Sequence, residues 1–123
     1  MPDHSQYTSS IHYDKRLYCH DIDGSLAHVR MLAKQDIISQ EDAASIADGL
    51  AQVRREIETD VFPWDAGLED LHMNIESRLT QLIGPVAGRM HTGRSRNDQI
   101  ALDMRLYTKD VIAQTIKGLR GVQ

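Results

Sequence analysis

The chain has 123 residues, with 14 lysines and arginines against 18 aspartates and glutamates, so its formal net charge is −4. This length allows one domain, and the acidic balance excludes a domain that is basic overall, as nucleic-acid-binding domains usually are. Hydrophobic residues make up 41% and charged residues 26%, a composition typical of a folded, soluble chain. Neither a bilayer-spanning apolar stretch nor a signal peptide is recognisable, so we expect a cytoplasmic protein without a membrane partner.

The sequence predicts an all-α fold, because aromatic residues are only 5% and runs of β-branched residues are few. Apolar residues recur at three- and four-residue steps in residues 21–34, 43–57 and 71–82, and each repeat predicts one helix. Ser39 and Asp42 have the spacing of a capping box, which predicts where the second helix begins. Phe62 and Trp64 are expected to pin a loop over residues 60–67, and the Gly84-Pro85 pair is expected to end the third helix.

The last segment keeps helical periodicity from Ile100 to Val122 without any stop signal. Helices of ordinary domains end with a cap, so this pattern predicts a chain that is cut inside a long helix of a central bundle. We therefore divide the chain into an N-terminal helical domain, residues 1–85, and the start of a helical-bundle domain, residues 86–123.

Residues 88–99 concentrate hydrogen-bonding side chains directly before this long helix. Arginines, Thr92, Ser95 and Asn97 offer donors, and a helix N-terminus adds free N–H groups, so the segment suits an anion such as a carboxylate or a phosphate. The alternative is a solvated loop in which Ser95 or Asn97 merely caps the helix.

A second polar group, residues 69–76, places carboxylates, a histidine and an asparagine on the first turns of the third predicted helix. Helical spacing puts Asp70 with Asn74, and His72 with Glu76, on shared faces, while Leu71 packs inward. This arrangement suits a hydrated polar helix face next to a functional site. The alternative is an exposed acidic face at a helix N-terminus. Two side chains at one spacing are a weak signal for a metal, so none is expected.

Three segments together resemble the argininosuccinate lyase family, within the superfamily that includes fumarase, aspartase and the lens δ-crystallins. Residues 91–99, HTGRSRNDQ, are similar to the family's form of the first superfamily signature; we call them the signature segment. Residues 69–79, EDLHMNIESRL, and residues 10–14, SIHYD, are similar to two further family segments in the same order. The chain is thereby identified as an N-terminal piece of a family member.

The resemblance implies a reversible β-elimination of argininosuccinate to arginine and fumarate, a step of arginine biosynthesis, without a cofactor. It implies substrate-binding roles for Ser10, Asp14, Ser95, Arg96 and Asn97. It further implies supporting roles for Asp70, His72 and Thr92. The catalytic base and acid are expected in segments outside this sequence, so no residue here is assigned to proton transfer. The family assembles as a homotetramer in which three subunits build each active site.

Two rival functions follow from the same residues. The δ-crystallins resemble these enzymes closely, so a structural protein of the same family is one alternative. Contact of Arg94 and Arg96 with nucleic acid is the other. It is disfavoured by the net charge of −4 and by the lack of an aromatic stacking platform.

Overall fold

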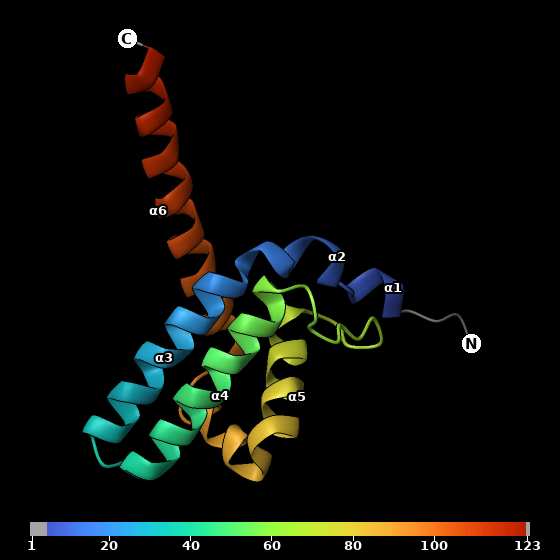
Figure 1. Ribbon diagram of the computed structural model, residues 1–123, viewed down its shortest axis with the longest axis vertical. Helices are drawn as coiled ribbons and strands as arrows, with labels where there is room; N and C mark the ends of the chain where they lie inside the picture. The colour runs from blue at the N-terminus through green and yellow to red at the C-terminus, as the bar shows by residue number, and fades with distance from the viewer. Residues whose placement is uncertain (1–4, 123) are drawn as a thin grey trace.

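The computed structural model describes residues 5–122, and in that range every regular element is a helix (Figure 1). In chain order the elements are α1 (Ser5–Thr8), α2 (Ile11–Asp14), the 3-10 helix η1 (Lys15–Leu17), α3 (Tyr18–Lys34), α4 (Gln40–Glu58), α5 (Leu71–Ile83), the 3-10 helix η2 (Gly84–His91) and α6 (Arg96–Val122). The predicted all-α fold is confirmed.

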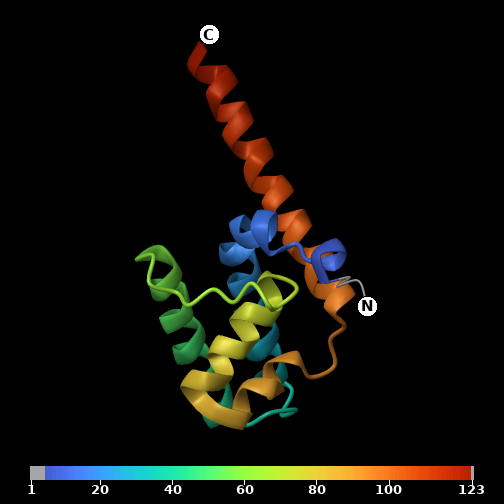
Figure 2. The same ribbon diagram turned by 90° about the vertical axis from the view of Figure 1, so that its right-hand side faces the viewer.

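The core lies between α3, α4, α5 and η2, which pack on one another below the start of α6 (Figures 1 and 2). Each helix contributes fully buried aliphatic side chains at helical spacing, among them Ile22 and Leu32, Ile46 and Leu50, and Leu71, Ile75 and Leu79. The helices α4 and α5 approach so closely at Gly49 that an added Cβ would lie 2.5 Å from Leu79 Cδ1. An alanine there would force the buried Leu79 side chain to shift.

The predicted helix ends are confirmed by local hydrogen bonds. Ser39 Oγ accepts from the Asp42 backbone N–H at 3.0 Å at the start of α4. Gly84 follows α5 with a φ of 75°, the left-handed conformation that glycine tolerates. The loop is held by Phe62, which is 6% exposed with its ring centroid 4.4 Å from that of Trp64.

Three details differ from the expectation. The helix α3 begins at Tyr18, three residues before the predicted start, and residues 84–91 form the 3-10 helix η2, which no sequence pattern predicted. Asp70 lies before α5 rather than within its first turn, and its carboxylate accepts from the Met73 N–H at 2.7 Å. A 3-10 segment lacks the 3.6-residue repeat that the helix prediction used, which is why η2 was missed.

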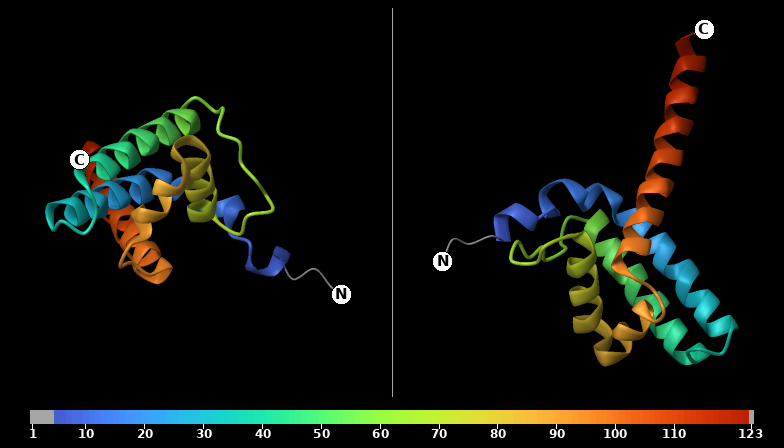
Figure 3. Two further views of the ribbon diagram at one scale, coloured as in Figure 1. Left: turned by 90° about the horizontal axis from the view of Figure 1, so that it is seen from below. Right: turned by 180° about the vertical axis from the view of Figure 1, so that it is seen from behind.

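Only the first part of α6 packs against α3, and the rest projects away from the body (Figures 1 and 3). From Thr108 to Val122 every residue of α6 is exposed, including the apolar residues Val111, Ile112, Ile116 and Leu119. Ala87 and Met90 of η2 belong to the common core, so the predicted second domain begins within it; the boundary at residue 85 stays a prediction. Between residues 5 and 122, no helix combines the length and apolar character that crossing a bilayer takes.

Candidate functional site

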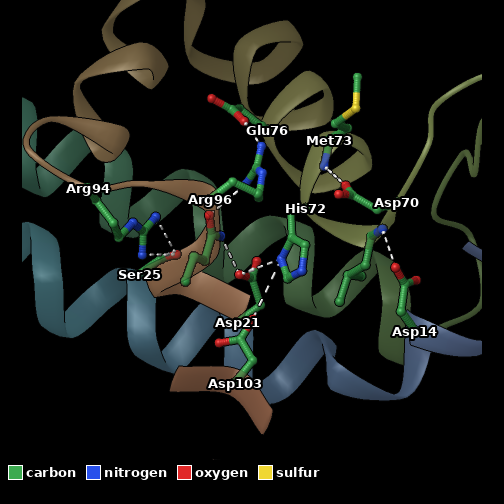
Figure 4. A network of polar contacts seen from close by, with 12 residues as sticks. Asp14, Asp21, Ser25, Asp70, His72, Met73, Glu76, Arg94, Arg96 and Asp103 are labelled. Carbon is green, nitrogen blue, oxygen red and sulfur yellow. Dashed lines mark hydrogen bonds and ion pairs between the residues drawn. The ribbon is translucent and has the colours of Figure 1, made fainter. Parts of the chain in front are cut away.

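Polar side chains gather where the N-terminal parts of α5 and α6 meet the first half of α3 (Figure 4). We call this set the polar cluster. It consists of Asp21 and Ser25 from α3, His72 and Glu76 from α5, Arg94 from the loop before α6, and Arg96, Gln99 and Asp103 from α6. Three helices that are far apart in sequence therefore contribute to one place.

The centre of the polar cluster is the buried pair of His72 and Asp21. His72 Nδ1 lies 3.0 Å from Asp21 Oδ1 and 3.6 Å from Asp103 Oδ2, and the side chains are at most 3% exposed. Gln99 Nε2 donates a second hydrogen bond to Asp21 Oδ1. The sequence prediction included His72 but neither carboxylate nor Gln99.

Burial and hydrogen bonding act in opposite directions on these groups. Burial alone would lower the pKa of His72, but its hydrogen bond to Asp21 and the charge of that carboxylate outweigh burial and raise it. Burial likewise acts to raise the pKa of Asp21, but the hydrogen bonds from His72 and Gln99 lower it overall. Burial and the neighbouring Asp21 carboxylate raise the pKa of Asp103 to about 8. The environment therefore favours an ionised Asp21 beside a protonated Asp103.

Asp21, His72 and Asp103 also offer ligand atoms within 4.8 Å of one another, close enough for one metal ion. The hydrogen bonds give a sufficient account of this geometry, because Asp21 Oδ1 already accepts from both His72 and Gln99. The sequence weakly suggested His72 and Glu76 as a pair of metal ligands. In the structure His72 instead contacts Asp21, and Glu76 accepts from Arg96.

Arg96 joins the signature segment to α5. Its Nη2 donates to Glu76 Oε2 at 2.7 Å, and its Nη1 donates to Gln99 Oε1 at 2.6 Å. Both side chains of the ion pair remain about 30% exposed, so this edge of the polar cluster reaches the surface. Arg94 points to α3, where both of its terminal nitrogens donate to Ser25 Oγ at 3.2–3.3 Å.

The start of α6 is capped by Ser95 and not by Asn97. Ser95 Oγ accepts from the Asn97 backbone N–H at 3.2 Å, and the Ser95 N–H donates to Asp98 Oδ2 at 3.1 Å. Of the two residues that the sequence offered as helix caps, Ser95 therefore caps α6 and Asn97 does not. The Asn97 side chain is exposed and has no partner among the described residues. Thr92 is also exposed, and its carbonyl oxygen lies 2.8 Å from His28 Nε2.

Ser10 and Asp14 form a second contact with α5. Ser10 Oγ donates to Asp14 Oδ2 at 2.7 Å, and the Leu71 backbone N–H donates to the same oxygen at 3.1 Å. Asp14 is buried, so it satisfies an otherwise free donor in the first turn of α5. Asp70 caps the same helix end, so Asp14, Asp70 and His72 lie around one helix start (Figure 4). Ser10 joins them through its hydrogen bond to Asp14.

The prediction of an exposed acidic face on α5 is wrong at two positions. His72 and Asn74 are both buried, and Asn74 Oδ1 accepts from the Asp65 backbone N–H at 2.8 Å. Polar residues at these positions therefore hold neighbouring segments instead of facing water. The structure brings the candidate residues into two groups, one at the start of α5 and one at the start of α6, which the Arg96–Glu76 pair connects.

Most of this chain aligns with known proteins. A family model described as "Lyase" matches residues 3–121. The argininosuccinate lyase of Oleidesulfovibrio alaskensis is 56% identical over 117 residues, which cover 95% of this chain and 25% of that protein. The argininosuccinate lyase of Desulfatibacillum aliphaticivorans is 59% identical over 113 residues, which cover 92% of this chain and 24% of that protein. The chain thus spans about a quarter of the length of these curated relatives. Because the family model covers nearly all of it, the chain belongs to the lyase family.

Proposed function

We propose that this chain forms the N-terminal part of an argininosuccinate lyase, which cleaves argininosuccinate reversibly to arginine and fumarate. The observation that carries the proposal is the placement of the signature segment. Its donors lie at the N-terminus of the 27-residue helix α6 and are tied to α5 through Arg96. The identity of 56–59% with the two argininosuccinate lyases supports this substrate over other aminosuccinates.

The difficulty of this β-elimination is electrostatic. The proton that leaves is bound to a carbon next to a carboxylate, so a second negative charge develops on that carboxyl group as the carbanion forms. Donors that are already fixed in place stabilise such charge without reorganising in the transition state. The start of α6 offers suitable donors: the exposed Asn97 amide, the Arg96 guanidinium, Ser95, and the positive end of the helix dipole.

We assign substrate binding to Ser95, Arg96 and Asn97, and to Ser10 and Asp14 at the start of α5. Ser10 donates to Asp14, and Asp14 accepts from the first N–H of α5, so the two residues hold the second wall of the proposed site. His72, Asp70 and Thr92 support these residues by orientation. The base that removes the proton belongs to the portion of the lyase outside this chain.

The same proposal includes a homotetramer in the cytoplasm. The exposed apolar residues Val111, Ile112, Ile116 and Leu119 run along the projecting part of α6, where a helical bundle would cover them.

The test is fumarate release by the complete lyase chain that contains this segment, supplied in turn with argininosuccinate, adenylosuccinate, aspartate and malate. We expect fumarate from argininosuccinate alone. A folded protein that releases none would favour the crystallin-like alternative, and release from another substrate would refute the assignment. Binding to nucleic acid through Arg94 and Arg96 is disfavoured by the net charge of −4, and Arg94 already donates to Ser25.

A further inference from the structure

A continuous hydrogen-bonded chain connects the signature segment to His72. Arg96 contacts Glu76 and also donates to Gln99 Oε1, and the Gln99 amide then donates to Asp21, which holds His72 Nδ1. The contact with Arg96 fixes which end of the Gln99 amide faces Asp21, because only the carbonyl oxygen can accept from a guanidinium. The two groups of candidate residues are therefore coupled through buried side chains.

The charges of this buried centre do not balance when both carboxylates are ionised. Asp21 and Asp103 are each 1% exposed, and Asp21 Oδ2 and both oxygens of Asp103 lack a hydrogen-bond donor among the described residues. Even a charged His72 neutralises only one carboxylate, and an unpaired buried charge is costly. The charged groups that face Asp103 are Asp21 from α3, His72 from α5 and Arg94 from the preceding loop. Arg94 donates to Ser25 Oγ and to neither carboxylate, so its charge favours the ionised form of Asp103 without a hydrogen bond. A single retained proton resolves the imbalance.

We propose that Asp21 is the positioning residue for His72, and that a proton retained between Asp21 and Asp103 locks α6 to α3 and α5 around it. Asp21 accepts from Nδ1–H, so the imidazole presents Nε2 in one orientation and one tautomer. Such a carboxylate behind a histidine acts through the ring that it holds. The effect on catalysis rests on the proposed lyase function, whereas the retained proton does not.

The proton gives the folded state a defined pH dependence. The folded pKa of Asp103 is raised to about 8, so its contribution to stability is complete below the unfolded pKa and is lost as the pH rises through about 8. The raised pKa of His72 acts in the same direction. Above about pH 8 the two carboxylates repel each other, and the orientation of His72 is expected to loosen.

The experiment compares Asp21→Asn, Asp103→Asn and the control Asp48→Asn in the complete lyase chain. Asp48 is exposed on α4 and has no partner among the described residues. Asp21→Asn should lower kcat at least about tenfold with little change in KM, as loss of a group that orients a histidine does. Asp103→Asn should raise the ratio of kcat at about pH 9 to kcat at about pH 7, because the titrating group is gone. Asp48→Asn should match the parent.

Thermal melting between about pH 5 and about pH 9 measures the proton without any substrate. We expect the melting temperature of the parent to fall more steeply with pH than that of Asp103→Asn. Equal slopes of melting temperature against pH for the two proteins would overturn the retained proton. A melting temperature that falls on addition of EDTA would also overturn it, because a metal ion would then hold the two carboxylates. An Asp21→Asn protein with parental kcat and pH profile would overturn the positioning role. If Asp21→Asn does not fold, Gln99→Met removes the link to Arg96 and should also lower kcat. An inactive but folded parent would refute the lyase assignment alone.

Discussion

Replacing Asn97 with alanine separates a substrate-binding role from a structural one. The side chain is exposed on the second residue of α6 and has no partner among the described residues, while Ser95 caps the helix. Its removal therefore costs no intrachain hydrogen bond. Alanine also has the higher helix propensity, so we expect Asn97→Ala to leave stability unchanged or to raise it by up to about 0.7 kcal/mol.

Catalysis should respond in the opposite direction. If the Asn97 amide stabilises the developing charge on the substrate carboxyl group, its loss should lower kcat/KM about a hundred- to a thousandfold, or about 2.7–4 kcal/mol in the transition state. The assay is fumarate release by the complete lyase chain, together with thermal melting. Ser39→Ala is the control, because it removes a true helix cap and should cost about 1 kcal/mol of stability with kcat/KM retained. An Asn97→Ala enzyme that turns over at the parental rate would refute the reasoning.

Four further predictions follow from packing and charge. Arg96→Lys loses the planar fork that reaches Glu76 and Gln99 together, so kcat/KM should fall about a hundredfold or more while melting changes little. Gly49→Ala drives a Cβ into Leu79 and should destabilise the fold by about 1–3 kcal/mol in denaturant titrations. Arg78 lowers the pKa of Glu56, so the stability from this pair should be lost as the pH falls through the folded pKa of Glu56, and Arg78→Met should flatten that acid limb. The isolated 123-residue chain should release no fumarate and should scatter light as an oligomer or aggregate, and a monomer that melts cooperatively would contradict the second expectation.

Short-range signals in the sequence predicted the helices well. The apolar repeat located α3 to α6, and the Ser39 cap and Gly84 located two of their ends, because these devices act within one turn of the chain. The resemblance of residues 91–99 likewise identified the family, which the family model confirms. The sequence left open whether Ser95 or Asn97 caps α6, because both residue types suit a helix start and a one-dimensional pattern does not rank such neighbours; the structure shows that Ser95 is the cap.

The buried centre of the polar cluster was not predictable in the same way. His72 and Asp21 are 51 residues apart, and Gln99 is 78 residues from Asp21, so no local spacing connects them. Asp103 interrupts the apolar pattern of α6 as any exposed aspartate would. Only the packing of α3, α5 and α6 shows that these polar residues face one another. A charged residue on the inward face of a predicted helix was the one signal that could have indicated them.

The central claim is that the start of α6 binds the carboxyl group on which charge develops. A crystal structure of the complete lyase with argininosuccinate bound, in a variant too slow to turn it over, tests this claim most directly. The account predicts that a carboxylate of the succinyl moiety accepts hydrogen bonds from Asn97 and from Ser95 or Arg96 at the N-terminus of α6. A substrate whose carboxylates are held elsewhere, with the Asn97 side chain still facing solvent, would contradict it.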